Sequence, residues 1–366
     1  MTLATTATWT EIHRQPEIWE SWAPELAARA GEIRRWIAAR GIEEVWLSGA
    51  GTSAFIGDVL AAGPPPLRPD PLRPDPLRLV PVPTTDIVAC PQDVLGASGR
   101  ILSLQFGRSG DSSESVGLLD LLDAHRPDID RLHVTCNADG ALATRVAPGP
   151  GEARALVLPS ATHDAGFAMT SSFTTMLLSA AACLGICDAA AALPRLAAGA
   201  RALLPALASR PAPRPGRAVF LGSGALKGVA RESALKVLEL TAGRTITQWD
   251  SPLGYRHGPK SAVDGATSVY VLLHPDPGTR RYDADVADEI ARQFPDIPVT
   301  TIGPGGDIAV EGTGDPRLDA ALYVLPAQIL SARWSQELGL PVDDPFQGRN
   351  LTRVVTGVTL YDYVPA

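Results

Sequence analysis

Hydroxyl-bearing residues collect at two places where a short apolar run gives way to a helical pattern. The first turn contains Gly51, Thr52 and Ser53, and the second contains Ser109 and Ser112. The N–H groups at the start of a helix carry partial positive charge, so hydroxyls beside them favour the binding of a phosphate group. Ser and Thr are also ordinary helix caps, and the first turn taken alone favours capping over phosphate binding.

The second turn shifts the interpretation toward phosphate binding. Asp111 and Glu114 are spaced like a capping box, and capping accounts for these two residues. It leaves the surplus of hydroxyls unexplained, together with Gly107 and Gly110. Two such turns at the carboxyl ends of strands in one sheet would converge on the crevice where open α/β sheets bind ligands. A third hydroxyl-rich stretch, residues 166–175, could close this site.

A dinucleotide cofactor is the main alternative for a glycine-rich turn that follows a strand. The spacing G-x-G-x-x-G fails in the first turn because Ala54 stands at its sixth position, and no acidic residue is suitably placed after the next strand. We therefore expect no nucleotide cofactor.

Three charged residues share one face of a helix that the apolar pattern predicts over residues 229–241. Glu232, Lys236 and Glu239 are spaced i, i+4 and i+7, which aligns them on that face. A surface stripe of ion pairs explains this spacing as well as a functional cluster does. The spacing alone leaves both interpretations open.

The segment 250–260 carries a histidine that could act with such a carboxylate. Its glycines and prolines predict that Tyr255, Arg256 and His257 lie on a rigid turn rather than in a core. A histidine with a pKa near neutral and a carboxylate on a neighbouring helix suit sugar chemistry. One group can open the sugar ring while the other moves a proton between C1 and C2.

These residues require a scaffold that brings strand ends together. Short apolar runs alternate with helical patterns, which predicts an α/β fold of mostly parallel sheets with helices on both faces. The predicted strands cover residues 45–47, 100–106, 132–136, 155–158, 268–273, 299–302 and 322–325, and a further strand begins at Arg217. The turn after that strand, residues 222–224, mirrors the first hydroxyl-rich turn, which indicates an internal repeat of one α/β unit.

The length of 366 residues is sufficient for two domains of ordinary size. We expect a helical segment over 1–40, a first domain over 41–188, a linker or helix over 189–216 and a second domain over 217–366. The first segment is expected to form two or three packed helices, broken at Pro16 and Pro24. Residues 63–78, in which Arg-Pro-Asp-Pro-Leu occurs twice, predict an extended surface loop without a function of its own.

The composition excludes several classes of partner. The net charge is −8 and Lys and Arg form no runs, which argues against nucleic acid and against an anionic membrane surface. No apolar stretch reaches the roughly eighteen residues of a membrane span, and the first twenty residues lack the pattern of a signal peptide. We expect a cytoplasmic protein. The four cysteines, at 90, 136, 183 and 187, lack metal-site spacing and are predicted to be buried free thiols.

Four stretches together resemble one family. They are Thr10-Glu-Ile with Gln15-Pro and Trp19, Gly49-Ala-Gly-Thr-Ser-Ala-Phe-Ile-Gly57, Phe167-Ala-Met-Thr-Ser-Ser-Phe-Thr174 and Leu253-Gly-Tyr-Arg-His-Gly-Pro-Lys-Ser261. The chain resembles the sugar-phosphate isomerases and deaminases with two sugar isomerase (SIS) domains, a family that includes the isomerase half of glucosamine-6-phosphate synthase. It is most similar to the branch that acts on galactosamine 6-phosphate or tagatose 6-phosphate, over nearly its whole length. The resemblance implies two tandem SIS domains, each a flavodoxin-like three-layer sandwich.

The resemblance also implies roles for individual residues. The substrate and its phosphate would be bound by Gly51, Thr52, Ser53, Arg108, Ser109, Ser112, Phe167, Ala168 and Arg353. Glu239 would be the base that moves the proton between C1 and C2, and Lys236 would lie beside the sugar. His257 would open the ring and would reach in from a neighbouring subunit, so that a homodimer is required for activity.

Two departures from the pattern of the synthase bear on the chemistry. Arg353 stands where the synthase has a lysine, and an arginine can bind a sugar oxygen but cannot form a Schiff base. Gly107 and Arg108 replace a serine and a glutamine, and Arg108 can add a positive charge to the phosphate pocket. The second residue is not a cysteine and the sequence contains no glutaminase domain, so we expect no ammonia transfer from glutamine.

The resemblance implies conversion of an amino-sugar 6-phosphate, galactosamine 6-phosphate, to the ketose phosphate and ammonia, without a metal or a cofactor. A plain aldose/ketose isomerase would use the same base and is the alternative within enzymes. A non-catalytic sugar-phosphate sensor is the alternative from another class. Such a regulator would usually carry a helix-turn-helix segment and could lack the base, whereas Glu239 and His257 are both present and no basic recognition helix is evident.

Overall fold

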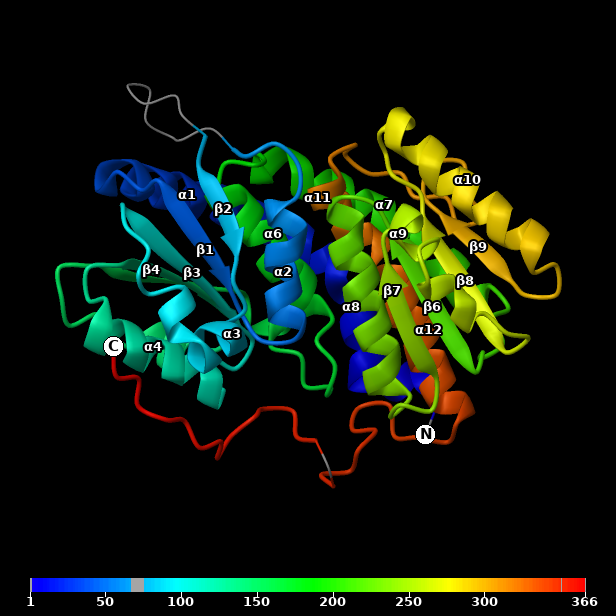
Figure 1. Cartoon of the computed structure of the whole chain (residues 1–366). Helices are drawn as coiled ribbons and strands as arrows, with labels where there is room; N and C mark the ends of the chain where they lie inside the picture. The colour runs from blue at the N-terminus through cyan, green and yellow to red at the C-terminus, as the bar shows by residue number, and fades with distance from the viewer. Residues whose placement is uncertain (1, 67–75, 350, 366) are drawn as a thin grey trace. The chain divides into compact units, whose positions relative to one another are not determined.

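The computed structural model describes residues 2–66, 76–349 and 351–365 (Figure 1). The chain forms two compact units that interleave along the sequence. The first unit comprises Ser21–His163, Thr175–Ala190 and Leu351–Ala366, and the second comprises Met1–Glu20, Asp164–Thr174 and Ala191–Asn350. This division departs from the expected domain bounds at both termini and at residues 164–174.

The first unit contains a parallel sheet with the strand order β2-β1-β3-β4-β5. Its strands are β1 (Glu44–Ser48), β2 (Arg78–Pro81), β3 (Ile101–Gly107), β4 (Asp130–Thr135) and β5 (Ala153–Val157). The four strands predicted in this half are confirmed, and β2, a short edge strand that is only partly buried, was not predicted. The order reverses between β1 and β3, and open α/β sheets bind ligands beyond the carboxyl ends of strands at such a reversal.

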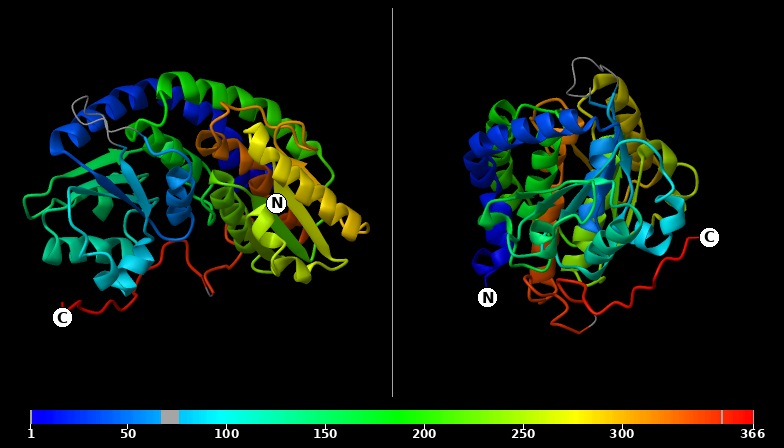
Figure 2. Two further views of the ribbon diagram at one scale, coloured as in Figure 1. Left: turned by 45° about the horizontal axis from the view of Figure 1, so that its top comes forward. Right: turned by 90° about the vertical axis from the view of Figure 1, so that its left-hand side faces the viewer.

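Helices cover both faces of this sheet. Figure 2 shows α1 (Ala7–Arg40) on one face and α3 (Thr84–Ala89) with α4 (Ser113–His125) on the other. On the second of these faces, Trp46 of β1 packs with Leu118 and Leu122 of α4. On the other, Arg40 at the end of α1 donates from Nε to Asp130 Oδ2 of β4 at 3.0 Å.

The second unit contains a parallel sheet with the order β7-β6-β8-β9, which reverses between β6 and β8. Its strands are β6 (Arg217–Gly222), β7 (Ile246–Asp250), β8 (Thr267–Leu272) and β9 (Val299–Ile302). Successive residues of β6 point to opposite faces. Val219 packs against Val286 of α10 (Pro277–Gln293), whereas Phe220 stacks on Tyr270, which approaches Trp334 of α12 (Leu325–Glu337). Both units are therefore α/β sandwiches, as expected.

The remaining helices are α2 (Thr52–Ala61), α5 (Ala141–Thr144), α6 (Ser171–Cys183), α7 (Ala189–Ser209), α8 (Ala225–Leu240), α9 (Pro252–Tyr255) and α11 (Pro316–Tyr323). Most of the linker or helix expected over 189–216 is the helix α7. Of the loop expected over 63–78, residues 67–75 lie outside the described residues. Among the helices of the described part of the chain, none combines the length and apolar character needed to span a membrane.

The N-terminal segment is one helix, and the prediction that it breaks at Pro16 and Pro24 is wrong. A proline in a helix normally leaves the carbonyl four residues earlier without its donor. At Pro16 that carbonyl belongs to Ile12, and Gln15 Nε2 donates to it at 3.0 Å. A neighbouring side chain thus supplies the hydrogen bond that the proline cannot make.

The strand predicted over residues 322–325 is also wrong, because these residues join α11 to α12. Leu322, Val324 and Leu325 are completely buried. A short apolar run looks the same whether a buried strand or a buried helix contains it.

The turns that follow β1 and β6 have the same backbone conformation. Gly51 has φ 55° and ψ −128°, and Gly224 has φ 56° and ψ −127°. A Cβ at Gly49 or at Gly222 would come within 2.6 Å or 2.3 Å of the backbone of the helix that follows. Each turn therefore requires glycine twice, once for the positive φ and once for the close approach of the helix.

Candidate functional site

Thr52 and Ser53 lie in the first turn of α2, directly after β1. The N-cap of α2 is Gly51, which has no side chain, so the capping interpretation does not apply to this turn. The N–H of Ser53 donates to the carbonyl of Ala50 at 3.2 Å. Both hydroxyl residues are 4% exposed, which places them inside the fold at the positive end of the helix.

The second turn connects β3 to α4, and the capping box predicted there does not form. Asp111 instead accepts a hydrogen bond from the N–H of Ala141, at the start of α5, at 2.7 Å. The N-cap of α4 is Ser112, and its hydroxyl donates to Ser115 Oγ at 2.7 Å rather than capping the helix backbone. Ser109 Oγ accepts from the N–H of Asp111 at 3.3 Å.

Arg108 brings a positive charge into this turn. It is 6% exposed, and its Nη2 donates to the backbone carbonyl of Arg353 at 3.1 Å. The glycine before it leaves room for Leu142, since a Cβ at Gly107 would lie 2.7 Å from Leu142 Cδ1. A serine at this position, as in the synthase, would therefore force Leu142 to move.

The two turns leave the sheet side by side. β1 and β3 are paired, with Ser48 opposite Gln105, so both turns start from the same edge of the sheet at the reversal of strand order. Backbone N–H groups, hydroxyls and a guanidinium are the donors that proteins use for phosphate. We call this group the phosphate cradle; it consists of Gly51, Thr52, Ser53, Arg108, Ser109 and Ser112.

The charged residues of α8 form one network in the second unit. Lys236 is completely buried, its Nζ lies 3.4 Å from Glu232 Oε1, and it donates a short hydrogen bond to Glu239 Oε2. Glu232 is also completely buried, whereas the side chain of Glu239 is 21% exposed. A surface stripe of ion pairs is therefore excluded. Of the three charged groups in this network, the carboxylate of Glu239 is the one that can reach solvent or a ligand.

The segment after β7 differs in part from its prediction. Tyr255 lies in the hydrophobic core beside Val219, and burial raises its pKa to about 12. Arg256 is ion-paired with Glu289 at 2.7 Å. His257 is exposed on the turn, and its N–H donates to the carbonyl of Gly254 at 2.9 Å. Among the described residues, no hydrogen bond joins the imidazole to Glu239.

In the third hydroxyl-rich stretch, an internal carboxylate binds three of the hydroxyls. Thr170, Ser171 and Ser172 are fully buried, and their hydroxyls all donate to the carboxylate of Asp164, at 3.3, 2.5 and 2.5 Å. The N–H groups of Thr170 and Ser172 bind the same carboxylate. Asp164 therefore binds three hydroxyls of this stretch, and closure of the site by residues 166–175 stays a prediction.

Phe167 and Ala168 lie just before these serines, in the second unit. The N–H of Phe167 donates to the carbonyl of Asp343 at 2.9 Å, and its ring lies 4.9 Å from that of Phe346. Ala168 is completely buried.

Glu11, on α1, holds the start of this segment and was not recognised as a site residue from the sequence. Its Oε1 accepts from the N–H of Ala165 at 2.6 Å and from that of Gly166 at 3.4 Å. Burial, with smaller contributions from the nearby carboxylates of Asp164 and Asp343, raises the pKa of Glu11 to about 7. No local pattern in the sequence indicates this role, because the partners lie about 150 residues away.

Replacing Glu11 by glutamine should remove a pH dependence of stability. Because the pKa of Glu11 is higher in the folded chain than its ordinary value of 4.5, the folded chain binds the proton more tightly. The resulting stabilisation is present below pH 4.5 and is lost as the pH rises to about 7. Urea unfolding from pH 4.5 to pH 8 should show the free energy of unfolding of E11Q rising relative to that of the wild type. A constant difference between them would contradict the assignment.

The duplicate turn after β6 holds no surplus of hydroxyls and is filled by an internal carboxylate. Ser223 Oγ donates to Asp283 Oδ1 at 2.5 Å, and the N–H of His274 donates to Asp283 Oδ2 at 2.8 Å. Asp283 is completely buried, and burial raises its pKa.

Among the described residues, His133 and the four cysteines provide no competing centre. His133 is buried in β4 and bonded to the Leu142 carbonyl, and burial lowers its pKa to about 4. The four cysteines are free, but Cys90 is exposed and Cys187 is only partly buried, contrary to the prediction that all four are buried. Burial raises the pKa of Cys183 to about 12. Within the described residues, no cluster of three or more His, Cys, Asp or Glu side chains could hold a metal ion.

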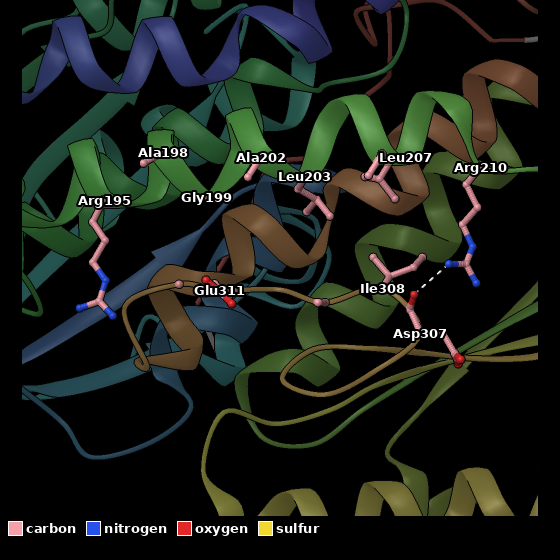
Figure 3. Close-up of a pocket in the computed structure, with 13 residues that line it drawn as sticks. Arg195, Ala198, Gly199, Ala202, Leu203, Leu207, Arg210, Asp307, Ile308 and Glu311 are labelled. Atoms are coloured by element: carbon pink, nitrogen blue, oxygen red, sulfur yellow. Dashed lines mark hydrogen bonds between the residues drawn. The ribbon is translucent and has the colours of Figure 1, made fainter.

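A pocket of about 690 Å³ lies between α7 and residues 307–312 (Figure 3). Its wall includes Ala202, Leu203 and Leu207, and at one end Arg210 donates to the carbonyl of Asp307 at 2.8 Å. The described lining contains no hydroxyl side chain and none of the predicted site residues, although it includes Arg195 as well as Arg210.

Comparison with known proteins gives full-length matches. No family model matches the chain. The D-galactosamine-6-phosphate deaminase AgaS of Escherichia coli is 37% identical and aligns over 98% of this chain and 97% of its own length. The enzyme of the same name from Shewanella sp. (strain ANA-3) is 37% identical over 98% and 93%. The crystal structure of tagatose-6-phosphate ketose/aldose isomerase from Escherichia coli superposes with a TM-score of 0.84, 32% identity and coverage of 100% and 99%.

Proposed function

Because the chain belongs to the double-SIS family of sugar-phosphate isomerases and deaminases, we propose that it converts galactosamine 6-phosphate and water to the ketose 6-phosphate and ammonia. The observation that carries the choice of substrate is the similarity to galactosamine-6-phosphate deaminases over nearly the whole chain. The enzyme class follows from membership in the family, and the substrate and the roles of the residues below are proposals.

The phosphate cradle binds the 6-phosphate in this proposal. Its support is the position of two turns at the strand reversal of the first unit, with Thr52 and Ser53 in one and Arg108 in the other. A phosphate near neutral pH carries close to two negative charges, which suit a guanidinium and the N-termini of α2 and α4. Binding at the 6-position leaves C1 and C2 free to react.

Glu239 moves the proton in this proposal. In the open-chain sugar it removes the proton from C2, which forms an enolamine, and returns it to C1, which leaves an imine at C2. Water then adds to the imine and ammonia leaves, so that the carboxylate regains its starting state. The short hydrogen bond from Lys236 fixes the orientation of Glu239. An arginine at position 353 cannot form a Schiff base, so no covalent step is required of it.

His257 opens the sugar ring, and we propose that it does so in the site of a second copy in a homodimer. Its support is the exposure of the imidazole on a turn that ends at Gly258, whose φ is 126°. A histidine exchanges protons near neutral pH and so can act on the ring oxygen.

A panel of hexose and hexosamine 6-phosphates, with ammonia and ketose measured separately, tests the proposal. We expect galactosamine 6-phosphate to release ammonia and ketose phosphate in equal amounts, with no turnover of the unphosphorylated sugar. The proposal would be contradicted if amino-sugar phosphates reacted without release of ammonia. It would also be contradicted if the enzyme converted none of the amino-sugar phosphates tested.

Plain isomerisation of an aldose 6-phosphate is the second candidate, favoured by the likeness to tagatose-6-phosphate ketose/aldose isomerase. The same base would move the same proton, and no ammonia would form. The ammonia measurement separates the two reactions.

A further inference from the structure

The C-terminal tail, residues 351–365, runs without helix or strand along α4 of the same unit (Figures 1 and 2). Two groups of contacts join the tail to the rest of this unit. The first lies at the phosphate cradle and the start of α4, and the second lies at the middle and end of α4. The contact between the tail and α4 could not be predicted from the sequence, because the apolar residues of the tail are not periodic.

At the cradle, the tail binds through its backbone. The carbonyl of Arg353 accepts from Arg108 Nη2 at 3.1 Å, and the carbonyl of Val355 accepts from the N–H of Ser113 at 3.0 Å. Ser113 is the first residue of α4, whose N–H has no acceptor within the helix. The tail thereby holds Arg353 beside the one guanidinium of the cradle.

Farther along α4, the tail binds through two side chains. Leu360 lies over Gly117, where an added Cβ would come within 2.4 Å of Leu360 Cδ1. The ring of Tyr363 meets that of His125 edge to face, 5.1 Å between centroids, and packs against the core cluster of Trp46 and Leu118. The neighbours of these two residues point outward, since Tyr361 is 87% and Val364 is 80% exposed.

We infer that Leu360 and Tyr363 are positioning residues that act through Arg353, by holding the tail on α4 so that Arg353 stays beside Arg108 and adds a second positive charge to the phosphate cradle. The inference rests on the proposed function for its account of turnover. Six residues lie between Arg353 and Leu360. An unanchored tail would therefore have to lose much conformational freedom each time Arg353 engaged a phosphate. The anchors remove that freedom in advance.

The test compares a double substitution of the anchors, L360S/Y363S, with a matched control at the exposed positions of the same tail, Y361S/V364S. We expect the anchor variant to raise KM for the sugar phosphate about tenfold with kcat unchanged, and the control to match the wild type. Arg353→Ala should raise KM by the same factor. Adding the anchor substitutions to R353A should raise it no further, because the anchors act only through Arg353.

Two readouts do not depend on turnover. The affinity for inorganic phosphate, measured by calorimetry, should fall about tenfold in the anchor variant and in R353A. Trypsin should cut after Arg353 faster in the anchor variant than in the control, at equal thermal stability. A tighter affinity for phosphate in the anchor variant would mean that the tail competes with the anion, and additive effects with R353A would mean that the anchors act elsewhere. Either result overturns the inference. If the wild type turns over no sugar phosphate, the proposed function fails while these two readouts still decide the role of the tail.

Discussion

Replacing Glu239 by glutamine is expected to lower kcat for the amino-sugar phosphate about 10³-fold, with KM changed by about twofold or less. Glutamine keeps the shape of the side chain but cannot take the proton from C2. The phosphate cradle, which supplies the binding energy in the proposal, belongs to a different unit and is unaltered. Steady-state release of ammonia measures the change. An E239Q enzyme with the wild-type kcat would remove Glu239 from the mechanism.

The matched control is Glu311→Gln, which neutralises an exposed carboxylate in the same unit and should leave kcat unchanged. Mixing E239Q with His257→Ala chains then tests the proposed exchange between subunits. If each site takes Glu239 from one chain and His257 from the other, random dimers should recover about a quarter of the wild-type activity. Recovery no greater than the sum of the two variants would place both residues in one chain.

Replacing Lys236 by methionine is expected to lower the free energy of unfolding by about 3–5 kcal/mol and to lower kcat as well. The substitution leaves the carboxylate of Glu232 completely buried without its cation and releases Glu239. Urea unfolding measures the first effect. The double variant K236M/E232Q should regain stability, because the buried charge is gone, but should not regain activity.

Lys227→Met is the matched control on the same helix. Lys227 is half-exposed and lies 3.7 Å from Asp250, so its removal should change the free energy of unfolding by about 1 kcal/mol or less. Equal losses for the two lysines would show that burial of the network around Lys236 contributes nothing.

The parts of the fold that depend on local pattern could be predicted from the sequence. The runs that became β1, β3 and β6 are apolar, and glycine-rich turns follow each of them. The need for glycine at 49 and 51 is a matter of backbone sterics within a few residues, so the turn can be recognised without knowledge of the rest of the chain.

The parts that depend on a distant or unexpected partner could not be predicted. Pro16 does not break α1 because the Gln15 side chain replaces its missing donor. The helix propensity of proline takes no account of a hydrogen bond from a neighbouring side chain. The hydroxyls of Ser171 and Ser172 looked available to a ligand, but their direction depends on Asp164, whose burial only the structure reveals. Likewise, Glu11 meets its partners across about 150 residues.

The carboxylate of Asp283 in the turn after β6 has a consequence for stoichiometry. That turn and the turn after β1 share one backbone conformation, yet the turn after β6 already has an anion bonded to its Ser223 hydroxyl. This anion is part of the chain, so it neither dissociates nor competes with solutes. In the proposed function we therefore expect one external anion in each chain, bound at the turn after β1, because Asp283 already occupies the corresponding turn of the second half.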